Sequence, residues 1–338
     1  MANIGVVGTG TWGTTLAIIM ARQAHNVRLW TRTEGEAEQL RSKGQHARFV
    51  PGVPFPDSLA VTASASEAFS EADLVIVAVP SRSFRENVRN IRGSLSNSAI
   101  VVSCTKGLEF ATGKRMSQIL EEELPASLQA GICALAGPNL AREVVEERPA
   151  STVVASKNPD AAKTAQAIIN SPRFRVYTND DIVGVELGGA LKNIIALGAG
   201  ACDGLRLGDN AKAGFLTRGL AEIARLSMAA GANPMTLAGL AGMGDLIATC
   251  SSPLSRNHYF GEQLAKGKTL EEIRASMNNV AEGVDTTAAA VKLAEKLGVE
   301  MPITQATYSV LFDGVAVSEV INQLLGRAPR PEQTGMSV

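Results

Sequence analysis

Three glycines near the N-terminus have the spacing of a dinucleotide-binding turn. Gly8, Gly10 and Gly13 form a G-x-G-x-x-G pattern between an apolar run at residues 3–7 and a helix-like stretch at residues 14–22. In this pattern the first glycine permits a tight turn, the second admits a pyrophosphate, and the third lets helix and strand pack closely. Free N–H groups at the helix start then face the anion. Glycine-rich turns also occur for structural reasons, and the flanking strand and helix favour the nucleotide interpretation.

The residues after the next apolar run indicate which nicotinamide cofactor is preferred. Residues 26–32 form the second strand-like run, and an acidic residue near its end would bind the 2′-hydroxyl of the adenine ribose and select NADH. This place holds Thr31, Arg32 and Thr33 instead. A guanidinium without a carboxylate suits a 2′-phosphate, so we predict that NADPH is preferred and NADH is possible. The alternative is that Arg32 is an ordinary solvated arginine, and Glu34 is close enough to weaken the preference.

Two lysines stand where the proton donor of a carbonyl reductase would be placed. Lys192 lies at residues 186–195, a stretch that is almost wholly apolar after its first residue. Burial lowers the pKa of a lysine toward the range useful for proton transfer, and a cationic neighbour acts the same way. Lys106 follows the apolar run at residues 100–103, at the sheet edge where doubly wound folds bind ligands. The alternatives are that Lys192 extends its ammonium to solvent and that Lys106 is a solvated loop lysine.

Polar residues further along the chain suit a phosphorylated substrate. Asp245 follows a glycine-rich turn, which lets the backbone approach another group closely. Ser255, Arg256 and Asn257 offer a hydroxyl, a forked cation and an amide in successive positions, and such a set suits a phosphate. An ordinary surface loop explains Ser255, Arg256 and Asn257 equally well.

The elements that would position these residues form two domains. Apolar strand-like runs alternate with helix-like stretches, which is typical of a doubly wound parallel sheet. Besides the first two, these runs occupy residues 74–79, 100–103, 132–136, 152–155 and 175–177. After residue 180 the apolar residues recur at helical spacing, at 185–201, 216–230, 270–277, 286–297, 306–312 and 317–325. We therefore predict a Rossmann-type α/β domain at 1–180, an all-helical substrate-binding and catalytic domain at 181–330, and a flexible tail at 331–338.

Composition and charge argue against several other classes of protein. The net charge of −1 gives no long-range field, so binding to nucleic acid or a membrane surface is not expected. The four cysteines stand singly and away from histidine clusters, so we expect no metal site and no disulfide framework, and a reducing cytoplasm fits. The N-terminus lacks the basic region of a signal peptide, and no apolar stretch suggests a membrane span. A soluble, cytoplasmic protein is predicted.

Six motifs together resemble those of bacterial NAD(P)-dependent glycerol-3-phosphate dehydrogenase. They are GTGTWGTTLA, SCTKGLE, AGPNLAREV, ELGGALKNIIALGAGACDGLRLGDNAKAGFLTRGLAE, GLAGMGDLIATCSSPLSRN and VAEGVDTT, in this order from residue 8 to about residue 287. The resemblance implies reversible NAD(P)H-dependent reduction of dihydroxyacetone phosphate to sn-glycerol 3-phosphate, which feeds glycerophospholipid synthesis. A homodimer is also expected, although the Ala- and Gly-rich helices at 185–244 could pack a core as easily as a dimer.

The resemblance also implies a role for each matching position. Cofactor contacts are implied for Thr11, Trp12, Arg32, Lys106, Ala141, Arg256, Val280 and Glu282, beside the glycine turn. Substrate contacts are implied for Lys106, Gly137, Asn139, Lys192, Asp245, Ser255, Arg256 and Asn257. Lys192 would be the general acid in reduction and the base in reverse, and Lys106 would stabilise negative charge on the substrate oxygen. Where many relatives carry Ser or Thr, this chain has Asn139, whose amide can still donate and accept.

Two other functions would fit the same two-domain plan. A 3-hydroxyacid dehydrogenase or a ketopantoate-like reductase also carries a lysine on a helix after the Rossmann sheet. Such an enzyme binds a carboxylate, whereas Lys106 with Ser255, Arg256 and Asn257 suits a phosphate dianion better. A non-catalytic NADPH sensor would lack the proton donor, yet Lys192 is present in its expected setting.

Overall fold

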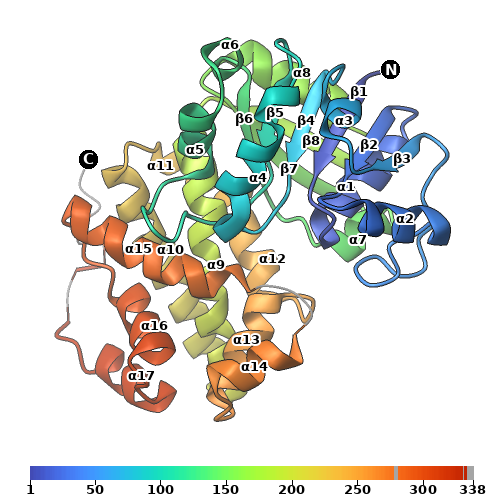
Figure 1. Cartoon of the computed structure of the whole chain (residues 1–338). Coiled ribbons are helices and arrows are strands. Elements are labelled where there is room, and N and C mark those ends of the chain that lie inside the picture. Colours follow the sequence, from blue (N-terminus) through green and yellow to red (C-terminus); the bar gives the residue numbers. More distant parts are fainter. Residues whose placement is uncertain (278–280, 330, 333–338) are drawn as a thin grey trace. The chain divides into compact units, whose positions relative to one another are not determined.

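The computed structural model describes residues 1–277, 281–329 and 331–332, and the chain forms two compact units (Figure 1). We call them the sheet unit, Met1–Thr105 with Met116–Ile182, and the helical unit, Lys106–Arg115 with Val183–Val338. The segment Lys106–Arg115, which the sequence predicts within the first domain, belongs with the helices. Most of the tail predicted at 331–338 lies outside the described residues.

One eight-stranded sheet, in the order β3-β2-β1-β4-β5-β6-β7-β8, is the centre of the sheet unit. Its strands are β1 (Asn3–Val7), β2 (Asn26–Trp30), β3 (Leu59–Thr62), β4 (Leu74–Val77), β5 (Ile100–Ser103), β6 (Ile132–Ala136), β7 (Ala150–Ala155) and β8 (Phe174–Asn179). The strand order changes direction between β1 and β4, and this switch point is where doubly wound folds bind ligands. Both strands are almost wholly buried, as their apolar sequences predict. The predicted Rossmann-type fold is confirmed.

Helices connect the strands of the sheet unit (Figure 1). They are α1 (Thr11–Ala21), α2 (Glu34–Lys43), α3 (Ala65–Phe69), α4 (Phe84–Ile91), α5 (Met116–Glu123), α6 (Ala126–Gln129), α7 (Ala141–Val145) and α8 (Pro159–Ile169). Three of them begin after capping residues: the side chains of Thr33, Ser64 and Asn158 accept from backbone N–H groups of α2, α3 and α8. The helix α1 is buried from Gly13 to its end, so it packs as a core helix beneath the glycine turn.

The sheet differs from the prediction in two places. The four-residue strand β3 at the sheet edge was not predicted, because its sequence LAVT contains only two large apolar residues. β7 runs antiparallel to β6, with Ala136 opposite Val153, so the sheet is mostly rather than wholly parallel. The connection carries only the short α7, which is fixed to α1 by Arg22 Nη1 donating to the Val145 carbonyl at 2.7 Å. It supplies no long crossover helix, which a parallel return usually needs.

The helical unit is assembled around one long apolar helix. Its elements are α9 (Ile182–Gly204), α10 (Asp209–Ala229), α11 (Pro234–Leu237), the π-helical turn η3 (Leu240–Gly244), α12 (Asp245–Ser251), α13 (Arg256–Ala265), α14 (Leu270–Ser276), α15 (Glu282–Leu297), α16 (Pro302–Phe312) and α17 (Val317–Leu325). A Cβ on Gly200 would lie 1.9 Å from the His258 carbonyl oxygen, and one on Gly261 would lie 1.8 Å from that of Leu197. The backbones of α9 and α13 therefore touch, and only glycine permits this.

The central helix α9 corrects the expectation that no stretch resembles a membrane span. By length and composition alone, it is long and apolar enough to cross a membrane. However, 89% of its apolar window is buried inside the protein, where Leu187, Ile194 and their neighbours pack against other helices. A core helix shows the same composition as a spanning helix because both are surrounded by apolar groups.

The segment Lys106–Arg115 is fixed to the helical unit by burial and by an ion pair. Leu108 is fully buried in the same apolar cluster as α9. Arg115 Nη1 lies 2.5 Å from Glu186 Oε2 on α9, and both side chains are largely buried. This anchoring places Lys106, the first residue of the segment, beside the middle of the helical unit.

Candidate functional site

The glycine turn follows β1 at the switch point of the sheet. Gly8 has a φ of +114°, and a Cβ there would lie 2.4 Å from the Ala78 carbonyl oxygen. A Cβ on Gly13 would lie 2.0 Å from the Gly8 carbonyl oxygen, whereas a Cβ on Gly10 would meet nothing within 4 Å. Gly8 and Gly13 are thus needed for the turn itself, and Gly10 leaves open the space that a pyrophosphate would occupy.

The start of α1 fits an anionic dinucleotide. Thr11 and Trp12 begin this helix, which has no side-chain cap at Gly10 and no acidic residue in its first turn. Trp12 packs edge-on against Phe174, and its buried Nε1 has no hydrogen-bond partner among the described residues. Free N–H groups on a partly buried helix end favour a ligand that accepts from them, so the site suits a phosphate-bearing cofactor.

Arg32 lies just beyond β2, at the place where the adenine ribose is expected. The side chain is exposed, and within the described part of the chain it forms no ion pair. The preceding Thr31 is buried, and its hydroxyl donates to the Thr33 carbonyl at 2.9 Å. The backbone around Arg32 is therefore fixed while its guanidinium is open to a ligand.

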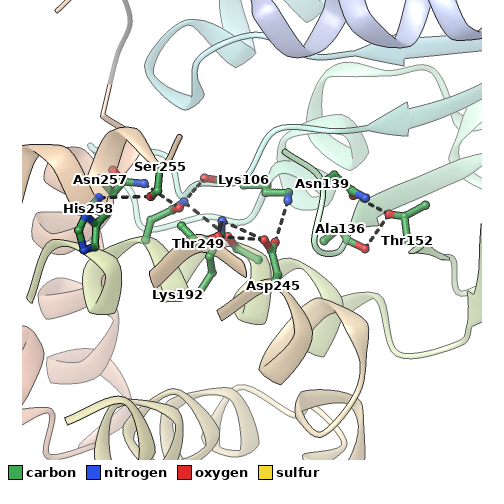
Figure 2. A network of polar contacts seen from close by, with 12 residues as sticks. Lys106, Ala136, Asn139, Thr152, Lys192, Asp245, Thr249, Ser255, Asn257 and His258 are labelled. Carbon is green, nitrogen blue, oxygen red and sulfur yellow. Dashed lines mark hydrogen bonds and ion pairs between the residues drawn. The ribbon is translucent and has the colours of Figure 1, made fainter. Parts of the chain in front are cut away.

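The loop between β6 and α7 contains the sheet-unit residues implied in substrate and cofactor contact. Gly137 has a φ of +154°, and a Cβ there would lie 2.9 Å from the Cα of Thr152. The Asn139 amide donates to the Ser151 carbonyl at 3.1 Å and accepts from the Thr152 hydroxyl at 2.9 Å, as Figure 2 shows in part. Both polar atoms of Asn139 thus tie the loop to β7. Ala141 follows as the first residue of α7.

A buried group of charges lies in the helical unit (Figure 2). Asp245 is 1% exposed, and its carboxylate lies 2.7 Å from Lys106 Nζ and 3.0 Å from Lys192 Nζ. Lys192, on α9, is 5% exposed and also donates to the Thr249 hydroxyl at 2.6 Å. That hydroxyl donates to Asp245 Oδ1 at 3.1 Å, one turn along α12. Lys192 is therefore buried and oriented by two groups, and it does not extend to solvent.

Burial and the neighbouring charges set the protonation of this group. Burial lowers the pKa of Lys192 to about 8; the Asp245 carboxylate opposes this shift, and the Lys106 ammonium adds to it. Burial by itself would raise the pKa of Asp245, but the ammonium groups of Lys106 and Lys192 outweigh it and hold the pKa below its usual value. A lysine whose pKa lies close to physiological pH, beside an ionised carboxylate, can give and take a proton under those conditions.

A chain of amides joins this charged group to the start of α13. Asn193 Nδ2 donates to the Lys106 carbonyl at 3.0 Å, and its Oδ1 accepts from Asn257 Nδ2 at 2.8 Å. Asn257 Oδ1 in turn accepts from the Gly283 N–H at 3.0 Å, at the start of α15. Asn257 is buried, so the alternative of a surface loop at this position is wrong.

The remaining predicted residues of the helical unit lie at two helix starts. Ser255 is buried as the N-cap of α13, and its hydroxyl oxygen accepts from the His258 N–H at 3.2 Å. Arg256 is the exposed first residue of that helix. Glu282 is the partly exposed first residue of α15, and Val280 lies outside the described residues.

Thr249 and Asn193 are functional candidates that the sequence analysis did not identify. Asn193 is a polar residue directly after Lys192 in an apolar stretch, and this pattern could have indicated a functional residue. Thr249 lies four residues after Asp245, but this spacing has meaning only once α12 is known to be a helix. Over the described part of the chain no cluster of His, Cys, Asp or Glu could hold a metal ion, and the four cysteines are free and buried.

Comparison with known proteins identifies the family. The family model described as NAD-dependent glycerol-3-phosphate dehydrogenase N-terminus matches residues 3–162, and the corresponding C-terminus model matches residues 181–322. A protein of Dehalococcoides mccartyi named glycerol-3-phosphate dehydrogenase (NAD(P)+) is 48% identical over 99% of this chain and 94% of that protein. The chain belongs to the NAD-dependent glycerol-3-phosphate dehydrogenase family.

Further relatives of this dehydrogenase family agree in sequence and in structure. A glycerol-3-phosphate dehydrogenase (NAD(P)+) of Chlorobium limicola is 47% identical over 98% of this chain and 99% of its own length. The crystal structure of glycerol-3-phosphate dehydrogenase from Coxiella burnetii is 34% identical, with a TM-score of 0.91 over 96% of this chain and 99% of that one. The chain is therefore an oxidoreductase that uses a nicotinamide cofactor, and the rival dehydrogenase classes are not supported.

Proposed function

We propose that the chain catalyses the NAD(P)H-dependent reduction of dihydroxyacetone phosphate to sn-glycerol 3-phosphate, together with the reverse oxidation. The observation that carries this proposal is the buried group of Lys106, Asp245 and Lys192. Two ammonium groups on one carboxylate leave net positive charge in a largely water-free place. That charge suits a phosphorylated substrate whose carbonyl oxygen becomes negative during reduction. The product is the backbone of glycerophospholipids, so we assign the enzyme to their synthesis.

In this proposal each unit binds mainly one of the two ligands, the cofactor or the substrate. The sheet unit, close to the predicted domain 1–180, holds the nucleotide through Gly8, Gly10, Thr11, Trp12, Gly13, Arg32 and Ala141. The helical unit, close to 181–330 but with Lys106 added, holds the substrate and the proton donor. Gly137 and Asn139 remain proposed substrate contacts of the sheet unit, with Asn139 also fixing its loop. Lys106, Arg256, Val280 and Glu282 remain proposed contacts of the cofactor.

The proton transfer is assigned to Lys192. Its Nζ gives a proton to the C2 carbonyl oxygen in reduction and takes it back in oxidation, and the bound nicotinamide supplies or accepts the hydride at C2. Asp245 keeps Lys192 protonated near neutral pH, and the Thr249 hydroxyl fixes the direction of the ammonium. Lys106 stabilises negative charge on the same oxygen. A non-catalytic sensor would need none of these groups.

The phosphate of the substrate is assigned to the start of α13. Arg256 supplies a forked cation there, and the free N–H groups of the helix add positive potential. The Ser255 oxygen accepts a backbone hydrogen bond, which leaves its hydroxyl hydrogen for a phosphate oxygen. Asn257 uses one amide hydrogen on Asn193 and has a second to donate.

The direct test is NAD(P)H oxidation followed at 340 nm with purified protein and dihydroxyacetone phosphate. We expect rapid oxidation that requires the phosphate, because unphosphorylated dihydroxyacetone offers no anionic group to Arg256 and the start of α13. The unphosphorylated ketone is the matched control. No oxidation with either NADPH or NADH would refute the proposed reaction, and equal rates with both ketones would refute the phosphate site.

NADPH is proposed as the preferred cofactor, with NADH as a weaker one. Arg32 is exposed where the 2′-phosphate would lie, and none of the three residues directly after β2, Thr31 to Thr33, is acidic. Arg32→Asp is expected to lower kcat/KM for NADPH and raise it for NADH, changing their ratio by roughly 10²-fold or more, because a cation is exchanged for an anion beside a phosphate. An unchanged ratio of the two kcat/KM values would show that Arg32 does not read the 2′-phosphate.

A homodimer in the cytoplasm completes the proposal. The exposed face of α10 contains small residues, including Ala213 and Gly214, and a Cβ on Gly214 would meet nothing within 4 Å. Such a face allows close approach of a second copy, and sedimentation velocity distinguishes dimer from monomer. The four free cysteines fit a reducing compartment, which cell fractionation tests.

A further inference from the structure

We propose that Arg41 is a specificity-determining residue for the cofactor. It pairs with Glu34 and so neutralises a carboxylate that would otherwise repel the 2′-phosphate beside Arg32. This inference rests on the proposed preference for NADPH. It adds to that proposal a residue in the last turn of α2 that the glycine motif does not contain and that acts through Glu34.

The first turn of α2 lies beside the nucleotide-binding turn. Thr33 is the N-cap of α2 and Glu34 its first residue, so Glu34 is two positions from Arg32 across the cap. The Thr9 hydroxyl, within the glycine turn, donates to Glu36 Oε1 at 2.6 Å. A negative charge on this first turn is therefore close to the place that receives the adenosine part of the cofactor.

The acidic residues of this turn already have partners. Glu36 accepts from Thr9, as described, and Glu34 forms an ion pair with Arg41 Nη2 two helical turns later. Arg41 Nη2 also lies 3.0 Å from Glu38 Oε2, and its Nη1 donates to the Val61 carbonyl of β3 at 3.2 Å. The bond to β3 holds the guanidinium in place, so it does not move freely as most surface arginines do.

This pairing decides which charge the cofactor meets. An acidic residue at the end of β2 or the start of α2 is what NADH-selective folds use against the ribose 2′-hydroxyl, and Glu34 could serve in that way if released. With Arg41 on Glu34, the charge of this carboxylate is offset, and Glu34 no longer opposes the Arg32 guanidinium. The ion pair itself contributes little to stability at an exposed position, but it changes the charge near the ligand.

The size of the effect follows from Coulomb's law in water. Two elementary charges about 7 Å apart interact by an amount worth roughly threefold in a binding constant. A phosphate with close to two charges makes this roughly three- to tenfold, and salt reduces it. NADH lacks the 2′-phosphate, so its binding should change much less.

The test compares kcat/KM for NADPH and NADH in four variants at low salt. Arg41→Gln removes the charge and keeps a polar side chain, and we expect the NADPH to NADH ratio to fall roughly three- to tenfold. Adding Glu34→Gln to it should restore the ratio, because the released carboxylate is then gone. Arg28→Gln, on β2 and 3.8 Å from Glu67, removes a cation of the same unit and should not alter the ratio. Arg32→Asp is the fourth variant.

Each outcome decides between the two proposals. An unchanged ratio in Arg41→Gln, with a changed ratio in Arg32→Asp, overturns the role of Arg41 and leaves the role of Arg32 intact. If the ratio falls in Arg41→Gln and adding Glu34→Gln does not restore it, the proposed role of Arg41 is also overturned, because the effect does not act through Glu34. If Arg32→Asp leaves the ratio unchanged, the NADPH proposal fails first and this inference fails with it. In Arg41→Gln, its double variant with Glu34→Gln, and Arg28→Gln, a kcat/KM for NADH close to that of the parent shows that the variant is folded.

Discussion

Lys192→Ala is expected to lower kcat for dihydroxyacetone phosphate reduction by roughly 10²- to 10⁴-fold and to leave the Kd for NADPH nearly unchanged. Lys192 is the buried ammonium whose pKa burial lowers to about 8, and its removal takes away the proton donor. Lys192 is not among the proposed cofactor contacts, and the glycine turn and Arg32 are in the other unit, so NADPH binding should persist. Steady-state rates at 340 nm give kcat, and quenching of protein fluorescence by NADPH gives Kd.

The fold should survive this change, because Asp245 keeps its ion pair with Lys106 at 2.7 Å and no buried charge is left without a partner. Lys292→Ala is the matched control, since Lys292 is a helix lysine of the same unit that lies over the Phe110 ring at the surface. It should leave kcat within about twofold of the parent value, as most surface substitutions do. Near-normal turnover in Lys192→Ala would remove Lys192 from the mechanism.

Asp245→Asn should change the pH dependence of reduction as well as its rate. In the parent enzyme, reduction needs protonated Lys192, so kcat/KM for reduction should fall as pH rises above about 8. The reverse oxidation needs the neutral amine and should rise through the same range. Asp245 is the neighbour that raises the pKa of Lys192, while Lys106 lowers it. The Asp245→Asn variant therefore loses the raising effect of Asp245 on this pKa and keeps the lowering effect of Lys106.

The falling limb of the reduction profile should therefore move to lower pH, by roughly one to two units. At pH 8, where about half of Lys192 is protonated in the parent, this shift corresponds to a loss of roughly 5- to 50-fold in kcat/KM. Asparagine keeps the shape of the side chain, so packing changes little. The measurement is kcat/KM from about pH 6 to 9.5, and an unmoved limb would contradict the assignment of Asp245.

Glu222→Gln is the matched control for this experiment. Glu222 is another buried carboxylate of the helical unit, but it accepts from the Ile303 and Thr304 N–H groups at the start of α16. Its described hydrogen bonds go to the backbone at that helix end and not to Lys106 or Lys192. The substitution leaves the proton donor untouched, so stability should change while the falling limb of the reduction profile stays near pH 8.

Local patterns in the sequence determined much of this protein. Gly8, Gly10 and Gly13 sit between a buried strand and a helix, and this order can be read directly because each part is set by neighbours in the chain. The same holds for the helical half, where apolar spacing predicted α9 and α17 close to their observed bounds. The order of motifs also gave the family.

Tertiary structure decided how the chemical groups meet. Lys106 and Asp245 are 139 positions apart in the chain. Lys106 follows a strand of the sheet unit in sequence but packs with the helical unit. Local periodicity carries no information on such pairings. For the same reason, the sequence did not predict the antiparallel pairing of β6 with β7 or the burial of Asn257.

The sequence by itself thus determined the fold class, the family and the types of residue available for catalysis. Only the folded chain decided that Thr249 orients Lys192, that Asn193 joins Lys106 to Asn257, and that both polar atoms of Asn139 hold its loop to β7. The physical reason is that secondary structure follows from neighbours a few residues apart. Hydrogen bonds and pKa values at a buried site depend instead on distances between elements that are remote in sequence.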